Sequence, residues 1–208
     1  MAYRTSDKVR QKKDAKRTAM MQTAVQVFAE KGYHAATVRD IVQKAGVAIG
    51  TFYFYFPDKE TLFVYLYEET GEFLAQTLEQ AISGKDKLHH QIAAGVQAYV
   101  NVALYEPAVI HLMLVGGIGA IPSLHEKRAV FRERMTQMWQ RPLDFASDDG
   151  NLPDQNTRRS AEMIAGACDE AILNLLAQPD AESGGPAAVR DMTLFILRGL
   201  GYNSQEKN

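Results

Sequence analysis

Apolar side chains recur at helical spacing along most of this chain. Between residues 14 and 31 the recurrence is clear in Met20, Ala24 and Phe28, and Gly32 follows at the position where a helix C-terminus favours glycine. No segment of useful length alternates apolar and polar residues, as a half-buried strand would. The pattern therefore predicts an all-α protein.

The segment after this first helix predicts two short helices joined by a tight turn. Thr37-Val38-Arg39-Asp40 has the form of a capping box, in which the outer two side chains bond each other's backbone N–H groups. The short helix that follows ends at Gly46, and the next begins about three residues later, through residues 49–53. Pro57-Asp58 then breaks the chain and caps a long helix over residues 59–82. So close a turn makes the short helices cross steeply, as in a helix-turn-helix whose second helix enters the major groove of DNA.

The rest of the chain predicts five more helices. Pro107, Pro122 and Pro153 stand where a first-turn proline is tolerated, and clusters of Gly, Ser, Pro and Asp separate the apolar stretches. The predicted helices cover residues 86–105, 107–115, 122–146, 154–178 and 186–201.

The composition is typical of a folded protein without a membrane span. Hydrophobic residues make up 46% of the chain and charged residues 23%, an ordinary globular balance. No apolar run reaches the roughly 18 residues of a spanning helix, and no apolar segment follows the charged N-terminus, as it would in a signal peptide. The single cysteine, Cys168, excludes an internal disulfide framework and cannot hold a zinc ion alone. We therefore expect a cytoplasmic protein with no membrane partner, no metal and no cofactor.

Charge is divided unevenly along the chain. Residues 1–59 carry 11 Lys and Arg against 5 Asp and Glu, whereas the remaining residues carry 12 against 20. This split favours a basic part that meets a polyanion, although a solvated basic tail gives the same totals. Residues 1–12 lack apolar periodicity and are predicted to form a flexible basic arm.

Five aromatic residues stand in a row at positions 52–56, and a helix of 3.6 residues per turn cannot bury them all. The first and last of them share one face and are expected to pack on the first helix. Tyr53 and Tyr55 must point elsewhere, and a phenol hydroxyl on an exposed face is a good donor to a DNA phosphate. Lys59 lies in the first turn of the long helix, where its positive charge opposes the helix dipole. This position is better explained if an anion docks at the start of that helix and meets the lysine.

One pattern of residues extends over positions 17–63. It consists of Arg17, Ala24, Phe28, Gly32-Tyr33, Thr37, Asp40-Ile41, Ala45-Gly46-Val47, Gly50-Thr51-Phe52-Tyr53, Tyr55-Phe56 and Lys59-Glu60. In its spacing, its turn glycine and its aromatic-then-lysine ending, this pattern resembles the TetR family of transcriptional repressors. The resemblance implies a three-helix helix-turn-helix DNA-binding domain over residues 1–58, including the basic arm. A larger helical ligand-binding and dimerisation domain is then expected over residues 59–208.

The resemblance also implies contacts with DNA. The positions that match phosphate contacts of the family are Thr37, Tyr53, Tyr55 and Lys59. Arg39 matches a position that reaches a base edge, and arginine to guanine is the commonest specific contact.

The start of the recognition helix is a further part of the expected DNA surface. Ile49, Gly50 and Thr51 are expected to contact thymine methyl groups or to allow close approach to the DNA. Ala48 departs from the family, which usually has Ser or Thr there, so this helix is expected to lack a side-chain N-cap. Because polar base readers are few on this helix, sequence preference is expected to rest on Arg39 and on DNA shape.

In this family the last two helices pair with their copies in a four-helix dimer interface. The resemblance therefore predicts a homodimer on a palindromic operator, and a two-fold dimer suits half-sites about 34 Å apart. The predicted interface residues are Ile164, Cys168, Ile172, Leu175, Met192 and Phe195. Ordinary packing within one chain gives the same apolar pattern.

Large apolar residues with occasional polar heads are candidates for a ligand pocket. They are Tyr99, Tyr105, His111, Met113, Phe131, Trp139 and Glu170. They indicate a small hydrophobic or amphipathic effector, such as a fatty acyl derivative, a drug or an aromatic compound, which releases the protein from DNA. For any one of these side chains, however, packing in the core is the favoured interpretation.

Two other classes of function compete with a ligand-responsive repressor. A small α-helical enzyme is disfavoured because no nucleophile elbow, metal cluster, phosphate loop or catalytic carboxylate pair is evident, so no catalytic residue is predicted. The glycine-rich segment at 115–119 follows a predicted helix, whereas the glycine-rich loop of a dinucleotide site follows a strand. An architectural DNA-binding protein without a ligand is disfavoured by the size and acidity of residues 60–208.

Overall fold

The computed structural model describes residues 7–202, and over these residues the chain forms nine helices and no strand. The prediction of an all-α protein is therefore confirmed. The first four helices are α1 (Asp7–Ala35), α2 (Val38–Lys44), α3 (Ile49–Tyr55) and α4 (Lys59–Ser83). The others are α5 (Leu88–Tyr105), α6 (Pro107–Leu114), α7 (Leu124–Asp148), α8 (Thr157–Leu176) and α9 (Ala181–Gly199). No helix among the described residues is long and apolar enough to cross a membrane.

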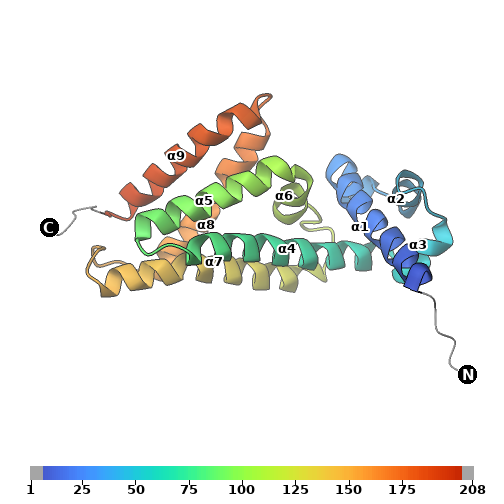
Figure 1. The fold of residues 1–208 in the computed structure, drawn as a ribbon, viewed down its shortest axis with the longest axis horizontal. Helices are drawn as coiled ribbons and strands as arrows, with labels where there is room; N and C mark the ends of the chain where they lie inside the picture. The colour runs from blue at the N-terminus through green and yellow to red at the C-terminus, as the bar shows by residue number, and fades with distance from the viewer. Residues whose placement is uncertain (1–6, 203–208) are drawn as a thin grey trace, which may run out of the picture.

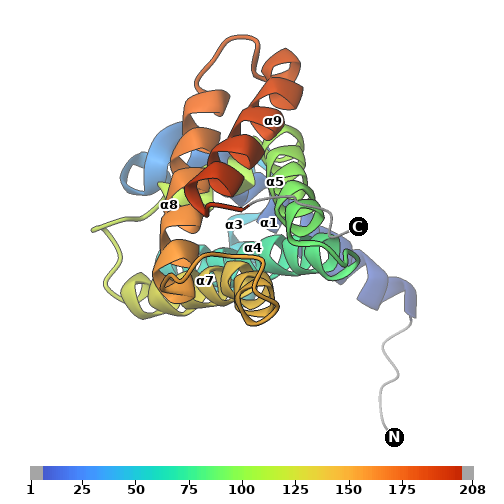
Figure 2. The same ribbon diagram turned by 90° about the vertical axis from the view of Figure 1, so that its left-hand side faces the viewer.

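The helices form an elongated molecule with α1, α2 and α3 gathered at one end (Figure 1). From there α4 runs along the length of the molecule beside α7. Viewed along the long axis, α4 and α7 form the base, and α5, α8 and α9 rise from it (Figure 2). α5 packs against both α4 and α9, α7 packs against α8, and α6 packs against α1.

The predicted helix boundaries near the N-terminus are confirmed by their caps. Thr37 Oγ1 accepts from the backbone N–H of Asp40 at 3.1 Å, and Asp40 Oδ2 accepts from the N–H of Thr37 at 3.0 Å, so the capping box is complete. Asp58 Oδ1 accepts from the N–H of Thr61 at 2.7 Å and caps α4. Gly32 and Gly46 adopt φ values of +73° and +64°, a region that favours glycine.

Two predicted boundaries differ from those of the structure by five residues or more. Residues 7–12, predicted to be a flexible arm, belong to α1, because Lys, Arg and Gln are good helix formers even without an apolar stripe; residues 1–6 lie outside the described residues. The last helix begins at Ala181 rather than at Pro186, which lies inside α9. A second internal proline, Pro142, lies inside α7.

Two hydrophobic clusters fill the described part of the chain. The first, here the N-terminal core, joins α1, α2 and α3 to the first two turns of α4, to α6 and to the start of α7. The second fills the space between the rest of α4 and α5, α7, α8 and α9. Ser123, just before α7, also donates from Oγ to Glu60 Oε1 on α4 at 2.6 Å. Residue 59 is therefore where a helix begins, but the N-terminal core continues beyond it.

Candidate functional site

A compact helix-turn-helix is built by α2 and α3. Each has seven residues, and the backbone N–H of Val47 donates to the carbonyl of Val42 at 3.0 Å across the turn at Gly46. Ile41 and Phe52 are fully buried on the inner faces of the two helices. These anchors hold the second helix, α3, with its opposite face toward solvent.

The outer face of α3 carries apolar and small residues at the start of the helix and an aromatic residue toward its end. Ile49 is 47% exposed and Tyr53 is 55% exposed. Gly50 is exposed, and a Cβ placed there would meet nothing within 4 Å, so the backbone at this point is open to close approach. Thr51 is half-buried, and Ala48 gives α3 no side-chain cap, as expected.

The aromatic run divides between core and surface as predicted. Phe52 and Phe56 are buried in the N-terminal core, whereas Tyr53 is exposed and Tyr55 is half-buried. The sequence pattern did not indicate where Phe54 lies, and the structure leaves it 69% exposed, with its ring edge-on to that of Tyr55 at 4.9 Å.

On α2, Arg39 is exposed at the second position of the helix, and no hydrogen bond or ion pair of its guanidinium is found among the described residues. Thr37 is also exposed, but its hydroxyl donates to Asp40 Oδ2 at 2.8 Å as part of the cap. Hydrogen bonds from Lys31 and Thr37 lower the pKa of Asp40 to about 2. The phosphate contact of Thr37 and the base contact of Arg39 stay predictions.

Lys59 has a role within the fold that the sequence did not indicate. Its Nζ donates to the carbonyls of Tyr33 at 2.6 Å and Ala36 at 2.8 Å, and lies 3.4 Å from that of His34. The ammonium also lies 4.3 Å from the centre of the Tyr33 ring. Burial lowers the pKa of this lysine. The cation at the start of α4 thus binds carbonyls of the segment that follows the kink at Gly32, at the end of α1 and just after it.

Replacing Lys59 by methionine is expected to cost about 1–3 kcal/mol of folding stability, because the carbonyls of α1 lose charged donors. Methionine keeps an apolar stem over Tyr33. If Lys59 also contacts a DNA phosphate, the variant binds all sequences more weakly and the salt dependence falls by about one unit of slope. Thermal unfolding and DNA binding at several salt concentrations measure the two effects separately.

The matched control for this change is Lys44→Met. Lys44 pairs with Glu30 at 2.6 Å on the surface, where both side chains are about half exposed, so its loss should cost less than about 1 kcal/mol. Equal stability of the two variants would contradict the structural role of Lys59. An unchanged salt slope would contradict its phosphate contact.

Comparison with known proteins agrees with this geometry. The sequence model described as "Bacterial regulatory proteins, tetR family" matches residues 21–66, which run from α1 into α4. The "Fatty acid metabolism regulator protein" of Bacillus subtilis (strain 168) is 35% identical over 84 residues, 40% of this chain and 43% of that protein. Residues 21–66 of this chain are thus similar to the DNA-binding part of the tetR family of bacterial regulators.

Further relatives and solved structures extend the comparison beyond the DNA-binding part. The "HTH-type transcriptional repressor KstR2" of Rhodococcus jostii (strain RHA1) is 28% identical over 148 residues, 67% of this chain and 69% of that one. FadR of Bacillus halodurans, described as a fatty acid degradation regulator, shares the fold with a TM-score of 0.77 at 24% identity, over 88% of this chain and 99% of that chain. FadR of Bacillus subtilis, solved with stearoyl-CoA, matches with a TM-score of 0.74 at 21% identity, over 85% and 97%. The first two curated relatives are matched over less than half of their own length, 43% and 33%.

The residues predicted to line a ligand pocket do not all lie in the interior of the described chain. Tyr105 is 85% exposed and Glu170 is also exposed, so these two predictions are wrong: both side chains lie on the outer faces of their helices. Tyr99, Met113 and Trp139 are buried, and Phe131 and His111 are half-buried.

The buried and half-buried members of this set pack closely against two glycines, Gly71 and Gly95. A Cβ placed on Gly71 of α4 would lie 3.0 Å from Met113 Cε and 3.1 Å from Phe131 Cδ2. A Cβ on Gly95 of α5 would lie 2.7 Å from the Trp139 ring. Among the described residues no hydrogen-bond partner is found for the buried Nε1 of Trp139 or the buried Nδ1 of His111. These two groups leave hydrogen-bonding capacity unused among the buried residues of α6 and α7.

The acidic residue that does face the interior is Asp169, the neighbour of Glu170. Tyr99 donates from its hydroxyl to Asp169 Oδ1 at 2.7 Å. Burial raises the pKa of the Asp169 carboxyl, although the hydrogen bond from Tyr99 offsets part of this. Burial also raises the pKa of Tyr67, on α4, to about 12. Asp169 lies three residues before the buried Ile172, and residues at this spacing share one face of a helix. This spacing is the sequence feature that could have indicated that Asp169 faces the interior.

The predicted dimer interface needs correction. On α8, the predicted residues are all buried in the core of their own chain with 6% exposure or less: Ile164, Cys168, Ile172 and Leu175. They offer no surface to a second copy, because the apolar stripe of α8 faces α7 and α9. Met192 is half-buried against the same core, whereas Phe195 is 68% exposed. The apolar residues that α8 and α9 present to solvent are Met163, Leu194 and Phe195.

Proposed function

We propose that this protein is a transcriptional regulator that binds operator DNA through α2 and α3 and represses the genes it controls. The observation that carries the proposal is the outer face of α3, where Ile49, Gly50 and Tyr53 are exposed while Phe52 anchors the helix from behind. That is the arrangement that places a recognition helix in the major groove. Relatives named as transcriptional repressors and regulators support it.

We further propose that the protein acts as a homodimer on a palindromic operator. Met163, Leu194 and Phe195 give α8 and α9 an exposed apolar face, which is typical of a surface that another protein covers. A two-fold dimer presents two copies of α3 to two half-sites. The division into a DNA-binding part up to residue 58 and a ligand and dimer part beyond it belongs to the same proposal.

The effector in this proposal is a small hydrophobic or amphipathic molecule that releases the protein from DNA. The interior of the helical domain supports it, because Trp139 and His111 leave polar groups unused among apolar side chains. The relative solved with stearoyl-CoA also favours a ligand with a large apolar part.

Arg39 provides the test of whether the protein recognises specific DNA bases. Replacing Arg39 by alanine is expected to cost about 1–3 kcal/mol on the operator and to relax the preference at one position in each half-site. Fluorescence anisotropy with DNA from upstream of the protein's own gene, and with single-base variants of it, measures both. A loss that is equal on every variant would make Arg39 a phosphate contact, and no binding by the wild type would contradict the proposed function itself.

A further inference from the structure

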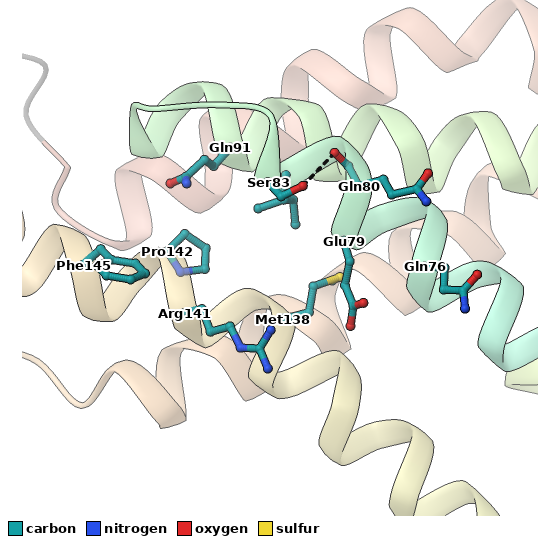
Figure 3. A pocket seen from close by; sticks show the side chains of 10 residues that line it. Gln76, Glu79, Gln80, Ser83, Gln91, Met138, Arg141, Pro142 and Phe145 are labelled. Atoms are coloured by element: carbon teal, nitrogen blue, oxygen red, sulfur yellow. Dashed lines mark hydrogen bonds between the residues drawn. The ribbon is translucent and has the colours of Figure 1, made fainter.

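A hollow of about 520 Å³ opens between the C-terminal end of α4, the start of α5 and the second half of α7 (Figure 3). None of the residues predicted for the ligand pocket lines it. It lies at the opposite end of α4 from α1, α2 and α3 (Figure 1). The hollow is therefore separate from the DNA-binding surface, and it borders the cluster around Tyr99 from outside, through Ile82 and Met138.

The polar side of the hollow carries one acidic and one basic residue, Glu79 and Arg141. Arg134, which lies outside the wall, pairs with both Glu79 and Glu72. Glu79 is the one acidic residue in its wall, and Arg134 binds its carboxylate with Nε at 3.1 Å and Nη2 at 3.2 Å. Arg141 is exposed, and no ion pair or hydrogen bond of its guanidinium is found among the described residues. The other polar side chains in the wall are neutral: Gln76, Gln80, Ser83 and Gln91. Arg141 is thus the charged residue of the wall for which no partner is found among the described residues, and its guanidinium is the group that an entering anion meets.

The other side of the hollow is apolar. Phe145 is 71% exposed, and Figure 3 shows its ring next to Pro142. Met138 and Ile82 complete this side. Pro142 has no N–H to donate to the carbonyl of Met138, four residues earlier in α7, so a backbone acceptor is also left over at this wall. A flat apolar group that covers the Phe145 ring removes exposed apolar area from water.

We propose that this hollow binds an amphipathic organic anion, with its flat apolar body on Phe145 and Pro142 and its acidic group on Arg141. The bound molecule lies between α4 and α7. Because α4 is one continuous helix from this hollow to Lys59, it links the site to the carbonyls at the end of α1. Binding at this site does not depend on DNA binding, so the two proposals can fail separately.

The test uses two fluorescent probes that share one aromatic body. Anilinonaphthalene sulfonate carries an acidic group, and phenylnaphthylamine is the same ring system without it. Arg141→Gln is expected to weaken the sulfonate probe about five- to tenfold, the effect of losing one charged contact at a partly exposed site. The same change should leave the affinity for the neutral probe as it is. Phe145→Ala should weaken both probes by a similar factor.

The matched control is Arg190→Gln, on α9, where the arginine is exposed and pairs with its neighbour Asp191. It should change neither affinity. Arg141 and Phe145 are both exposed, so the melting temperature should stay within a few degrees for all three variants. Equal affinity of Arg141→Gln and wild type for the sulfonate probe would overturn the anion site. Unchanged binding of both probes by Phe145→Ala would show that they bind elsewhere and would overturn it as well.

Discussion

Replacing Phe195 by arginine is expected to convert the proposed dimer into a monomer. Phe195 is 68% exposed on α9 beside Leu194, which is 41% exposed. In a dimer that covers this face, an arginine places an unpaired charge in an apolar interface, at a cost of several kcal/mol of association. Sedimentation at micromolar concentration measures the change. Operator affinity should collapse with it, because a single protomer keeps the contacts of only one half-site.

The control for this experiment is Phe73→Arg. Phe73 is a 50% exposed phenylalanine on α4, outside α8 and α9, so the same change there should leave the dimer intact. Both variants should keep their helical content, since neither side chain belongs to a core cluster. A wild-type protein that sediments as a monomer, yet binds a palindromic operator tightly, would refute the dimer.

Replacing Phe52 by alanine is expected to remove DNA binding by releasing the recognition helix. Phe52 is fully buried, and its ring packs near those of Tyr53 and Phe56. It is the one residue of α3 that is buried in the N-terminal core. Truncation of a buried phenylalanine costs about 3–5 kcal/mol, which is a large share of the stability of a small domain. Thermal unfolding and operator binding should both show the loss.

Phe54→Ala is the control, because Phe54 lies two positions along the same helix and is 69% exposed. Its change should cost less than about 1 kcal/mol. If Phe52→Ala and Phe54→Ala lowered stability equally, the helix would not be held as the structure shows. If Phe52→Ala bound DNA with wild-type affinity, the exposed face of α3 would not be the DNA surface.

Local signals made the DNA-binding end predictable from the sequence. The capping box at Thr37 and the glycines at 32 and 46 are short-range features, and each fixes a helix end by its own backbone geometry. The aromatic run was also informative, because five consecutive large side chains cannot share one face. The structure therefore agrees with the sequence most closely where the chain's own neighbours decide the conformation.

The part of the chain from α5 to α9 was less predictable, because its side chains are positioned by contacts with residues that are distant in the sequence. Apolar periodicity identifies a buried face but not the partner, so the stripe of α8 was assigned to a second copy although it covers the chain's own core. The pocket prediction for Tyr105 and Glu170 rests on their residue types alone, and both side chains are exposed. On α8 it is Asp169 that lies on the side of the helix facing the interior, where it binds Tyr99. The carbonyl partners of Lys59 lie 23 to 26 residues away in sequence, and no local pattern indicates such a contact.

The most direct test of the central claim is footprinting of the full-length protein on DNA from upstream of its own gene. The account predicts protection of two half-sites with inverted symmetry, about 34 Å apart on one face of the duplex. Arg39→Ala should weaken the protection of both half-sites equally. Binding that is no tighter than to random DNA of the same length, at physiological salt, would contradict a sequence-reading helix-turn-helix on α2 and α3.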